Sequence, residues 1–416
     1  MKVLVVGSGG REHAIVWKLS QSSKLEKVYC VPGNGGIEDL AQCIPGDMND
    51  IDFLVNFAKR NKIDLTVVGP ELPLTLGIVD AFQKEGLQIF GPTKEAAHLE
   101  GSKSYAKAFM KKYHIPTAEY IDTENIQKAL DSLRNFTYPL VIKADGLAAG
   151  KGVVIVKNES EAKDTIIEMM DDKVFGEAGK KVVIEEFLKG KEISLLVFFH
   201  QKGFVPMVSA QDYKRALDHD EGLNTGGMGA ISPSPIYNQK LKKRILEEIL
   251  QPTFEGMQKE KLEYRGVLYF GLMITQQGPK VLEYNVRFGD PETQVILPRL
   301  DNDLVDIMIK VIEDRLQDRD LKWKEENALT VTLTSGGYPL NYETGKLITG
   351  LNRKGEEIVF HSGTVKRDKK YYTDGGRVLT ITALGNSLGE AASKVYQKIS
   401  NIHFDDMYYR KDIGKY

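Results

Sequence analysis

Short apolar runs alternate with amphipathic stretches over the first hundred residues. Four of the runs are followed by Gly or Pro, which is typical of buried strands that end in a turn: residues 3–6, 27–31, 65–68 and 88–90. Three stretches between them have the spacing of amphipathic helices: residues 11–19, 51–60 and 76–85. Strands that alternate with helices predict a doubly wound parallel sheet, whose ligand-binding loops lie beyond the carboxyl ends of the strands.

The pattern changes near Gly101. Helices are expected at 103–113 and 239–259, among β-branched runs that are typical of an α+β domain: residues 115–120, 182–184, 193–199, 267–274 and 281–284. Beyond a charged linker at 314–327, the pattern predicts three strands and a final helix: residues 329–334, 357–360, 377–383 and 388–399. We therefore predict a multidomain α/β and α+β protein with three domains: residues 1–101, residues 102–315 with a subdomain at about 116–190, and residues 328–416.

Composition narrows the class of protein. The 416 residues are 42% hydrophobic and 27% charged, as in a folded globular protein. Lys and Arg number 56 against 58 Asp and Glu, which gives no support to nucleic-acid binding. The longest apolar run, residues 193–199, is too short to span a membrane, and the glycine-rich start does not resemble a signal peptide. Two cysteines build neither a disulfide framework nor a cysteine zinc site, so we expect a cytoplasmic protein.

The first candidate site is the loop GSGGREH, residues 7–13, which follows a strand and opens a helix. Backbone N–H groups in such a loop form an anion site. A dinucleotide fingerprint would need Gly where Glu12 stands, and no acidic residue follows the second strand. Arg11 therefore favours a phosphomonoester, and the alternative is a tight turn without a ligand. The loops that carry Asn34 and Glu71 are expected at the same sheet edge.

The second candidate is the segment YPLVIKADGLAAGKGVVIV, residues 138–156. It is not a P-loop, because its glycines are one residue too close and a strand follows where a helix should. A glycine flap between two antiparallel strands instead suits a triphosphate, with charge from Lys143 and Lys151. The alternative is a solvated hairpin, which Lys143 disfavours because a cation inside an apolar strand needs a partner.

Two further segments carry polar residues in suggestive positions. In VVIEEFLKGKEIS, residues 182–194, a strand meets carboxylates that could form an adenine-contacting hinge with a later carboxylate for ribose; the alternative is an ordinary charged hairpin. QDYKR at 211–215 and NTGGMGA at 224–230 form a long polar excursion. Such a loop indicates a lid or ligand loop, and the alternative is a mobile surface excursion.

The segment EYNVRFGDPET, residues 283–293, is the most informative. Strand period places Glu283, Asn285 and Arg287 on one face. A carboxylate, an amide oxygen and a guanidinium together suit Mg²⁺ and a phosphate, and the alternative is a solvent-facing polar strand edge. No H-E-x-x-H zinc pattern occurs, so a zinc-enzyme function lacks support.

Together these segments resemble the ATP-grasp ligases. Ten strings resemble, in the same order, the phosphoribosylamine–glycine ligase family: GSGGREH, VGPE, GSK, IKADGLAAGKGV, IEEFL, NTGGMGA, RFGDPET, TSGGYP, GGRVL and RKDIG. They run from Gly7 to Gly414, so the resemblance covers essentially the whole chain. It implies a pre-ATP-grasp domain at 1–101, an ATP-grasp domain at 102–315 whose subdomain carries the flap, and a small α+β domain at 328–416.

The resemblance also implies a reaction of de novo purine biosynthesis. Glycine, 5-phosphoribosylamine and ATP would give glycinamide ribonucleotide, ADP and phosphate, with ATP and Mg²⁺ (or Mn²⁺) required. The glycine carboxylate would first attack the γ-phosphate, and the amine of phosphoribosylamine would then displace phosphate from glycyl phosphate. We expect a monomer or a weak homodimer, with no nucleic-acid or membrane partner.

The roles that the resemblance implies fall into four groups. Nucleotide contacts come from the flap and the hinge: Lys103, Lys143, Gly146, Gly150, Lys151, Gly152, Glu185, Glu186, Leu188 and Glu192. The metal would be held by Glu283 and Asn285. The ribose phosphate would meet five residues: Gly9, Gly10, Arg11, Asn34 and Glu71. Glycine and the reacting phosphoryl group would be surrounded by catalytic residues: Lys143, Asp212, Lys214, Arg287 and Asp290.

The sequence departs from the wider ATP-grasp pattern at one point, and three other functions are weighed against the ligase interpretation. Many ATP-grasp enzymes carry an acidic metal ligand on the strand before the Glu-x-Asn strand, but residues 268–272 contain no carboxylate, which leaves the number of bound metals open. Another ATP-grasp carboxylate–amine ligase or carboxylase is the nearest alternative. A non-catalytic ATP-binding regulator is disfavoured by the joint presence of Lys143, Glu283 and Asn285, and a dehydrogenase by Glu12.

Overall fold

The computed structural model describes residues 1–148, 152–172, 175–351 and 355–415. Its N-terminal part is the expected doubly wound parallel sheet, in the order β5-β4-β1-β2-β3. The strands are β1 (Lys2–Gly7), β2 (Lys27–Pro32), β3 (Gln42–Cys43), β4 (Leu65–Val68) and β5 (Ile89–Pro92). The helices are α1 (Gly10–Leu19), α2 (Ile51–Asn61), α3 (Glu71–Leu76), α4 (Ile78–Lys84) and α5 (Lys94–Gly101).

The helix expected at 76–85 is wrong in one respect, because two helices occupy this region. Gly77 has φ +96° and ends α3 in a left-handed conformation, so the chain turns before α4 begins. This break lets α3 begin at Glu71, directly after the loop that follows β4.

The central part continues the same sheet in antiparallel strands. Tyr264 and Arg265 of β16 pair with Pro92 and Gly91 of β5 and join the two halves into one nine-stranded sheet. Its further strands are β10 (Lys191–His200), β11 (Gly203–Pro206), β16 (Tyr264–Ile274) and β17 (Pro279–Asn285). The covering helices are α6 (Lys103–Lys112), α9 (Gln239–Ile245), α10 (Gln251–Lys259), α11 (Thr293–Ile296) and α12 (Leu304–Ile312). A π-helical turn over Leu246–Leu250 links α9 to α10, so the long helix expected at 239–259 is continuous.

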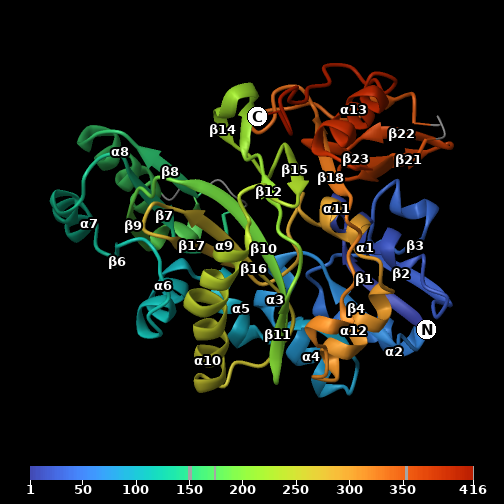
Figure 1. The fold of residues 1–416 in the computed structure, drawn as a ribbon, viewed down its shortest axis with the longest axis horizontal. Coiled ribbons are helices and arrows are strands. Elements are labelled where there is room, and N and C mark those ends of the chain that lie inside the picture. The colour runs from blue at the N-terminus through green and yellow to red at the C-terminus, as the bar shows by residue number, and fades with distance from the viewer. Residues whose placement is uncertain (149–151, 173–174, 352–354, 416) are drawn as a thin grey trace.

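A separate four-stranded sheet stands beside this body, at the left of Figure 1. Its strands, in the order β6-β9-β7-β8, are β6 (Tyr120–Thr123), β7 (Leu140–Ala144), β8 (Val153–Val156) and β9 (Val182–Glu186). Helices α7 (Ile126–Ser132) and α8 (Glu159–Met170) pack on it and enclose a small apolar core of their own. We call this part the flap unit. The strand expected at 115–120 begins only at Tyr120.

The C-terminal part contains a five-stranded sheet that takes in strands from the middle of the chain. Its order is β12-β15-β18-β23-β20, and the strands are β12 (Gln211–Asp212), β15 (Gly229–Ser232), β18 (Asn327–Thr334), β20 (Ile358–His361) and β23 (Arg377–Gly385). Helix α13 (Leu388–Ile399) packs on it. Two small sheets complete the part: β13 (Arg215–Leu217) with β14 (Glu221–Asn224), and β19 (Leu347–Ile348) with β21 (Thr364–Arg367) and β22 (Lys370–Thr373). The excursion at 211–230 is therefore anchored in a sheet.

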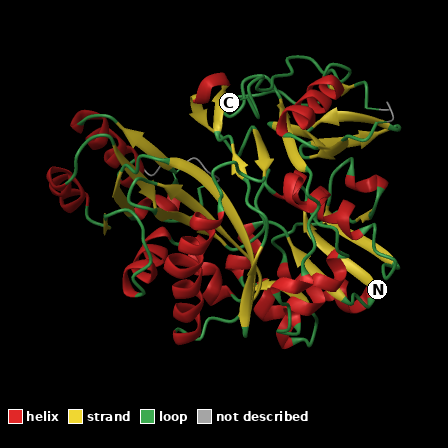
Figure 2. Cartoon of the chain, in the orientation of Figure 1, coloured by secondary structure: helices red, strands yellow, loops and turns green. Residues whose placement is uncertain are grey.

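Helices and strands alternate along the first hundred residues, which form the part at the lower right of Figure 2, as a doubly wound domain requires. Two large apolar clusters fill the two faces of the long sheet, and a third lies between the C-terminal sheet and α13. Among the described residues, no helix is long and apolar enough to cross a membrane.

Candidate active site

The N-terminal glycine loop is built around the carboxylate of Glu12. Glu12 Oε2 accepts the N–H of Gly9 at 2.5 Å, and the side chain is 2% exposed. A Cβ atom at Gly69 would lie 1.9 Å from Glu12 Oε1, so the loop after β4 needs glycine to make room. Glu12 thus occupies the space under the loop that the third glycine of a dinucleotide fingerprint leaves open. The structure therefore agrees with the exclusion of a dehydrogenase-type loop.

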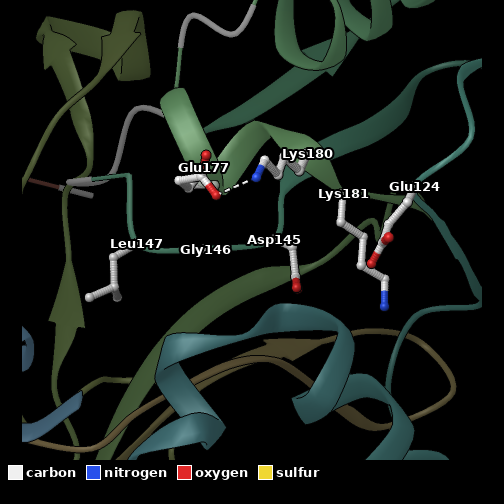
Figure 3. Close-up of a pocket in the computed structure, with 8 residues that line it drawn as sticks. Glu124, Asp145, Gly146, Leu147, Glu177, Lys180 and Lys181 are labelled. Carbon is white, nitrogen blue, oxygen red and sulfur yellow. Dashed lines mark ion pairs between the residues drawn. The ribbon is translucent and has the colours of Figure 1, made fainter. Parts of the chain in front are cut away.

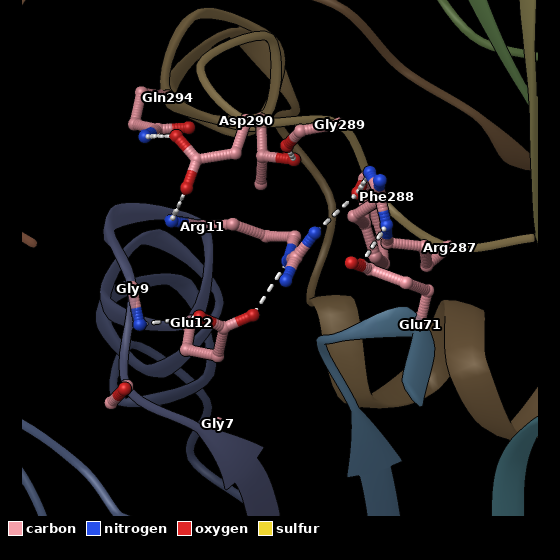
Figure 4. Close-up of polar contacts among 12 residues, drawn as sticks. Gly7, Gly9, Arg11, Glu12, Glu71, Arg287, Phe288, Gly289, Asp290 and Gln294 are labelled. Carbon is pink, nitrogen blue, oxygen red and sulfur yellow. Dashed lines mark hydrogen bonds and ion pairs between the residues drawn. The ribbon is translucent and has the colours of Figure 1, made fainter. Parts of the chain in front are cut away.

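Arg11 connects this loop to the segment after β17, as Figure 4 shows. Its backbone N–H lies 3.4 Å from Asp290 Oδ2, and its guanidinium donates to Glu12 Oε1 at 2.5 Å and to the Phe288 carbonyl at 3.2 Å. The residues are 277 to 279 positions apart in sequence, yet they form one surface. The N-terminal loop and the segment with Glu283, Asn285 and Arg287 are therefore two walls of a single site.

Asn34 and Glu71 lie on the same edge but differ in what they can offer a ligand. The Asn34 amide donates to the carbonyls of Ser8 and His361 and accepts the N–H groups of Gly36 and Ile37. Its hydrogen bonds are thus made within the protein, and its contact with a ribose phosphate stays a prediction. Glu71 points toward the site at the start of α3, where Arg287 lowers its pKa to about 2.

Arg287 is clamped between two carboxylates. Its Nε lies 2.9 Å from Glu71 Oε2, and its Nη2 lies 2.8 Å from Oε1 of Glu100, a buried residue of α5. Glu100 also accepts the Val286 N–H at 2.7 Å. Burial raises the pKa of Glu100 to about 7, although Arg287 acts in the opposite direction. The clamp fixes the guanidinium beside Asn285, whose Oδ1 is 3.4 Å from Arg287 Nη2.

Glu283 faces a group of cations. Its Oε1 lies 3.7 Å from Lys214 Nζ. Burial by itself would raise the pKa of Glu283, but Lys214, Lys143, Lys103 and Arg287 together lower it below its usual value. These side chains come from a loop, two strand regions and a helix start, so only the fold assembles them. The cluster suits polyanionic phosphates, with a carboxylate that stays charged among them.

A buried triad lies behind this cluster. Glu185 of β9 is 2% exposed and holds Lys143 Nζ at 2.8 Å and Lys107 Nζ at 2.9 Å, one lysine on each oxygen. The two ammonium groups lower the pKa of Glu185 although burial alone would raise it. Lys143 thus has the partner that a cation in an apolar strand requires. The carboxylate of Glu185 is engaged by lysines, so its predicted contact with adenine stays a prediction.

Lys214 and Asp212 enter from the excursion anchored by β12. Lys214 forms an ion pair with Glu192, the residue expected at the ribose, and faces Glu283. Glu192 acts with Tyr269 and Glu283 to raise the pKa of Lys214 well above its usual value against the effect of burial. Burial, reinforced by the nearby Glu292, raises the pKa of Asp212 well above its ordinary range.

Asp290 is held by three parts of the chain. Its carboxylate accepts Gln294 Nε2 at 2.8 Å and the Arg11 N–H, and it lies 3.3 Å from Nη1 of Arg377. Arg377 begins β23 in the GGRVL string and also donates to the carbonyl of Gly226. The C-terminal sheet thereby supports the loop that carries Asp290.

The flap and hinge residues that the structure describes lie at the entrance. Lys103 donates to the Gly146 carbonyl at 2.9 Å, and the Gly152 carbonyl accepts the Ala144 N–H. Beside Gly146 is a hollow of about 460 Å³ lined by residues of the flap unit, including Asp145 and Lys181 (Figure 3). On the hinge, Glu186 pairs with Lys280 at 2.9 Å, and Leu188 is mostly buried. Gly150 and Lys151, also expected on phosphates, lie outside the described residues.

A divalent metal fits Glu283 and Asn285 only with help from a ligand. In the described part of the chain, no group of three or more His, Cys, Asp or Glu side chains could hold a metal ion. The protein therefore supplies two hard oxygens, one of them on a carboxylate whose pKa is lowered. Mg²⁺ accepts such a set because it keeps water and substrate phosphate oxygens as its other ligands.

Sequence reasoning missed Glu100, Lys107, Glu292 and Arg377. Lys107 had a usable signal, since it stands four positions after Lys103 and so on the same face of a helix. Arg377 stood in a recognised string without an assigned role. Glu292 likewise stood in a recognised string, RFGDPET, without an assigned role, and in the fold it lies 2.9 Å from the Ser194 hydroxyl. Glu100 had no local signal, because it is identified only by its distant partner Arg287.

Three family descriptions match consecutive parts of the chain. The phosphoribosylglycinamide synthetase N domain matches residues 1–100, the ATP-grasp (A) domain of the same family matches 101–293, and its C domain matches 328–416.

Several similar proteins of nearly the same length are named phosphoribosylamine–glycine ligase. The chain is 51% identical over 414 residues to a phosphoribosylamine–glycine ligase of Caldanaerobacter subterraneus, covering 100% of this chain and 99% of that one. It is 48% identical to the Escherichia coli K12 protein of that name, covering 100% and 98%. The crystal structure of the Thermotoga maritima phosphoribosylamine–glycine ligase is similar with a TM-score of 0.87 and 35% identity, covering 99% and 100%. A Campylobacter jejuni biotin carboxylase, at 15% identity and TM-score 0.77, shares the fold. The chain therefore belongs to the phosphoribosylglycinamide synthetase family and has its three-domain ATP-grasp architecture.

Proposed function

We propose that this protein joins glycine to 5-phosphoribosylamine, with conversion of ATP to ADP and phosphate. The supporting observation is the continuity between Arg11 and Asp290, which makes the N-terminal anion loop and the cation cluster around Glu283 one site. If the N-terminal loop binds the phosphate of 5-phosphoribosylamine, the amine of that substrate points toward the cation cluster, where the phosphoryl group is transferred. An enzyme that only hydrolysed ATP would need one of these walls and not the other.

The reaction proceeds in two displacements. A glycine carboxylate oxygen attacks the γ-phosphorus, the bond to the ADP oxygen breaks, and glycyl phosphate forms. The amine of phosphoribosylamine then attacks the glycyl carbonyl, phosphate leaves, and the new amide loses the extra proton. The carboxylate must be activated in this way because an amine does not displace hydroxide from it at neutral pH.

The cations around Glu283 are assigned to the phosphoryl transfer. Lys103, Lys143 and Lys214 offer point charges, and Arg287 offers a fork held in place by Glu71 and Glu100. Charge that develops on the γ-phosphoryl group and on ADP is stabilised most by donors that are already in position. A divalent cation at Glu283 and Asn285, Mg²⁺ or Mn²⁺, would neutralise phosphate charge there.

The N-terminal wall is assigned to the ribose phosphate. The phosphomonoester is assigned to the start of α1 and to those N–H groups of the Arg11 guanidinium that Glu12 and the Phe288 carbonyl do not occupy. Asp290, whose pKa is lowered by Arg377 and Arg11 against the effect of burial, is assigned to the glycine ammonium group. Asp212, whose pKa is raised by burial, is assigned to the same end of the site as a hydrogen-bonding group. The cytoplasmic location and the monomeric or weakly dimeric state stay predictions, the second of which sedimentation would test.

One assay tests the proposal. ADP release is measured with ATP and glycine, with and without freshly made phosphoribosylamine, and the product mass is recorded. Glycine labelled with heavy oxygen in its carboxylate should deliver one labelled oxygen into phosphate in each turnover. Unlabelled phosphate in every turnover, or label in AMP, would exclude the glycyl phosphate route. Product formation with another acid or amine in place of glycine or phosphoribosylamine would identify a different ATP-grasp ligase.

A further inference from the structure

The segment at 409–414 is seated against the excursion that carries Asp212 and Lys214. The C-terminal end lies beside β14 in Figure 1. Three backbone N–H groups cross this contact: Lys411 to Asp218 Oδ1 at 2.7 Å, His219 to Asp412 Oδ2 at 2.9 Å, and Gly414 to the Tyr213 hydroxyl at 3.3 Å. Two stretches almost 200 residues apart are thus held together as one unit.

Arg410 is the centre of this contact. Its side chain is 1% exposed and makes a fork with both oxygens of Asp412, at 2.8 and 2.7 Å. Its Nη1 reaches across the contact to Asp220 Oδ1 at 2.8 Å and to the Arg215 carbonyl at 3.1 Å. We call Arg410 and these three partners the Arg410 clasp. A planar fork with fixed donors sets the distance between the two stretches more narrowly than a lysine could.

The clasp acts on the site through Tyr213. The Arg410 guanidinium lies 5.2 Å from the centre of the Tyr213 ring, and Tyr213 packs in the apolar cluster of the C-terminal sheet. Successive side chains of extended backbone point in opposite directions. With Tyr213 held on one side, Asp212 and Lys214 face the other, where Lys214 meets Glu192 and Glu283.

We propose that Arg410 is a positioning residue of the active site, which sets Lys214 and Asp212 against Glu192 and Glu283 by anchoring Tyr213 and the backbone of Arg215. The inference rests on the proposed function for its kinetic consequences, but the contacts that carry it do not involve a ligand. Arg410 touches neither the cation cluster nor the N-terminal loop. Its effect is therefore expected mainly on the glycine and phosphoryl end of the site, with only a small effect on ATP affinity through the pairing of Lys214 with Glu192.

The test compares Arg410→Lys and Arg410→Ala with wild type and with Lys346→Ala. Lys346 is a matched control, because it forms an ion pair with Asp406 in the same part of the chain without contacting the excursion. For both Arg410 variants we expect kcat/KM for glycine to fall about tenfold or more, with a smaller decrease in Arg410→Lys than in Arg410→Ala. The KM for ATP should stay within about twofold of the wild-type value. Lys346→Ala should match wild type.

Two results would overturn the inference. In the first, kcat/KM for both substrates falls only in proportion to a smaller folded fraction, with each KM unchanged, which is what a purely structural role produces. In the second, hydrogen exchange over Tyr213–Asn224 is no faster in Arg410→Lys than in wild type. Exchange does not depend on the reaction, so it tests the clasp even if no glycine-dependent ADP release is found. A third variant, Asp220→Asn, removes one partner that is mostly exposed and should give the same pattern more weakly without a loss of folding.

Discussion

Arg287 Nη2 lies 2.8 Å from the buried carboxylate of Glu100, and the two residues come from different halves of the nine-stranded sheet region. The pair explains why Arg287 stands beside Asn285 although it follows the end of β17. It also couples the site to a carboxyl group whose pKa is raised to about 7 by burial.

Glu100→Gln should change the pH dependence of stability. Because the folded-state pKa of Glu100 is raised, the folded protein binds its proton more tightly, and wild type loses this contribution as pH rises from about 4.5 through 7. Glutamine cannot titrate, so the stability of the variant relative to wild type should increase by roughly 2 kcal/mol between pH 5 and pH 7. Urea midpoints at pH 5, 6 and 7 would show the trend. A constant difference between the two proteins would contradict it.

Glu185→Ala should be strongly destabilising. It would leave the ammonium groups of Lys107 and Lys143 buried without their shared carboxylate, and breaking a buried pair costs about 3–5 kcal/mol. Thermal denaturation followed by circular dichroism would measure the shift. Glu159→Ala is the matched control, since its pair with Lys163 in the same flap unit is exposed and should contribute little to stability. Equal shifts in the two variants would show that the triad is not a stabilising unit.

Glu283→Ala should reduce kcat by roughly 100-fold or more while the protein stays folded. The reason is the loss of the carboxylate that would hold a divalent cation at the transferring phosphoryl group. Steady-state rates across a Mg²⁺ titration give the measurement, with Glu263→Ala, an exposed carboxylate before β16, as control. Near-wild-type turnover at saturating Mg²⁺ would remove Glu283 from the metal site.

Arg11→Ala should raise KM for phosphoribosylamine and leave KM for ATP nearly unchanged. Loss of a charge-assisted contact is worth about 1.5–3 kcal/mol, which corresponds to roughly 10- to 150-fold. Arg11 also pairs with buried Glu12, so a clear loss of thermal stability is expected as well. Arg60→Ala, on the surface of α2, serves as control. An equal rise in both KM values would assign the N-terminal loop to the nucleotide.

His13 and His361 should make the protein sensitive to acid. His13 Nδ1 accepts the His361 N–H at 2.8 Å, and burial lowers the pKa of His13 to about 3 and that of His361 to about 4. Both pKa values lie below the unfolded value near 6.5, so each residue reduces stability as pH falls below 6.5, by up to about 1.4 kcal/mol per pH unit. Urea midpoints of His361→Asn between pH 6.5 and 4.5 should fall less steeply than those of wild type. A substitution of the exposed His403 by Asn is the control. If the urea midpoint of His361→Asn changed with pH as steeply as that of wild type, the prediction would be contradicted.

The sequence by itself determined the features that depend on local periodicity. The parallel sheet of the first hundred residues, the long helix across 239–259 and the final helix follow from the spacing of apolar residues, which nearby residues alone can satisfy. The order of ten short strings identified the family, and the chemistry of Lys143 in an apolar strand required a buried partner. Each of these inferences uses short local runs of residues, or strings that keep their order along the chain.

Only the tertiary structure decided which distant charges meet. Arg287 pairs with Glu71 and Glu100 across more than 180 positions, and Arg410 reaches Asp220 across 190. The joining of β16 to β5 and the anchoring of 211–232 in the C-terminal sheet are decided in the same way. A buried charged side chain pairs with the opposite charge that the packed backbones bring within about 3 Å of it. The spacing of hydrophobic residues along the chain does not predict which charge that is. Local pattern therefore specified the elements, while the packing of those elements selected the partners that shape the site.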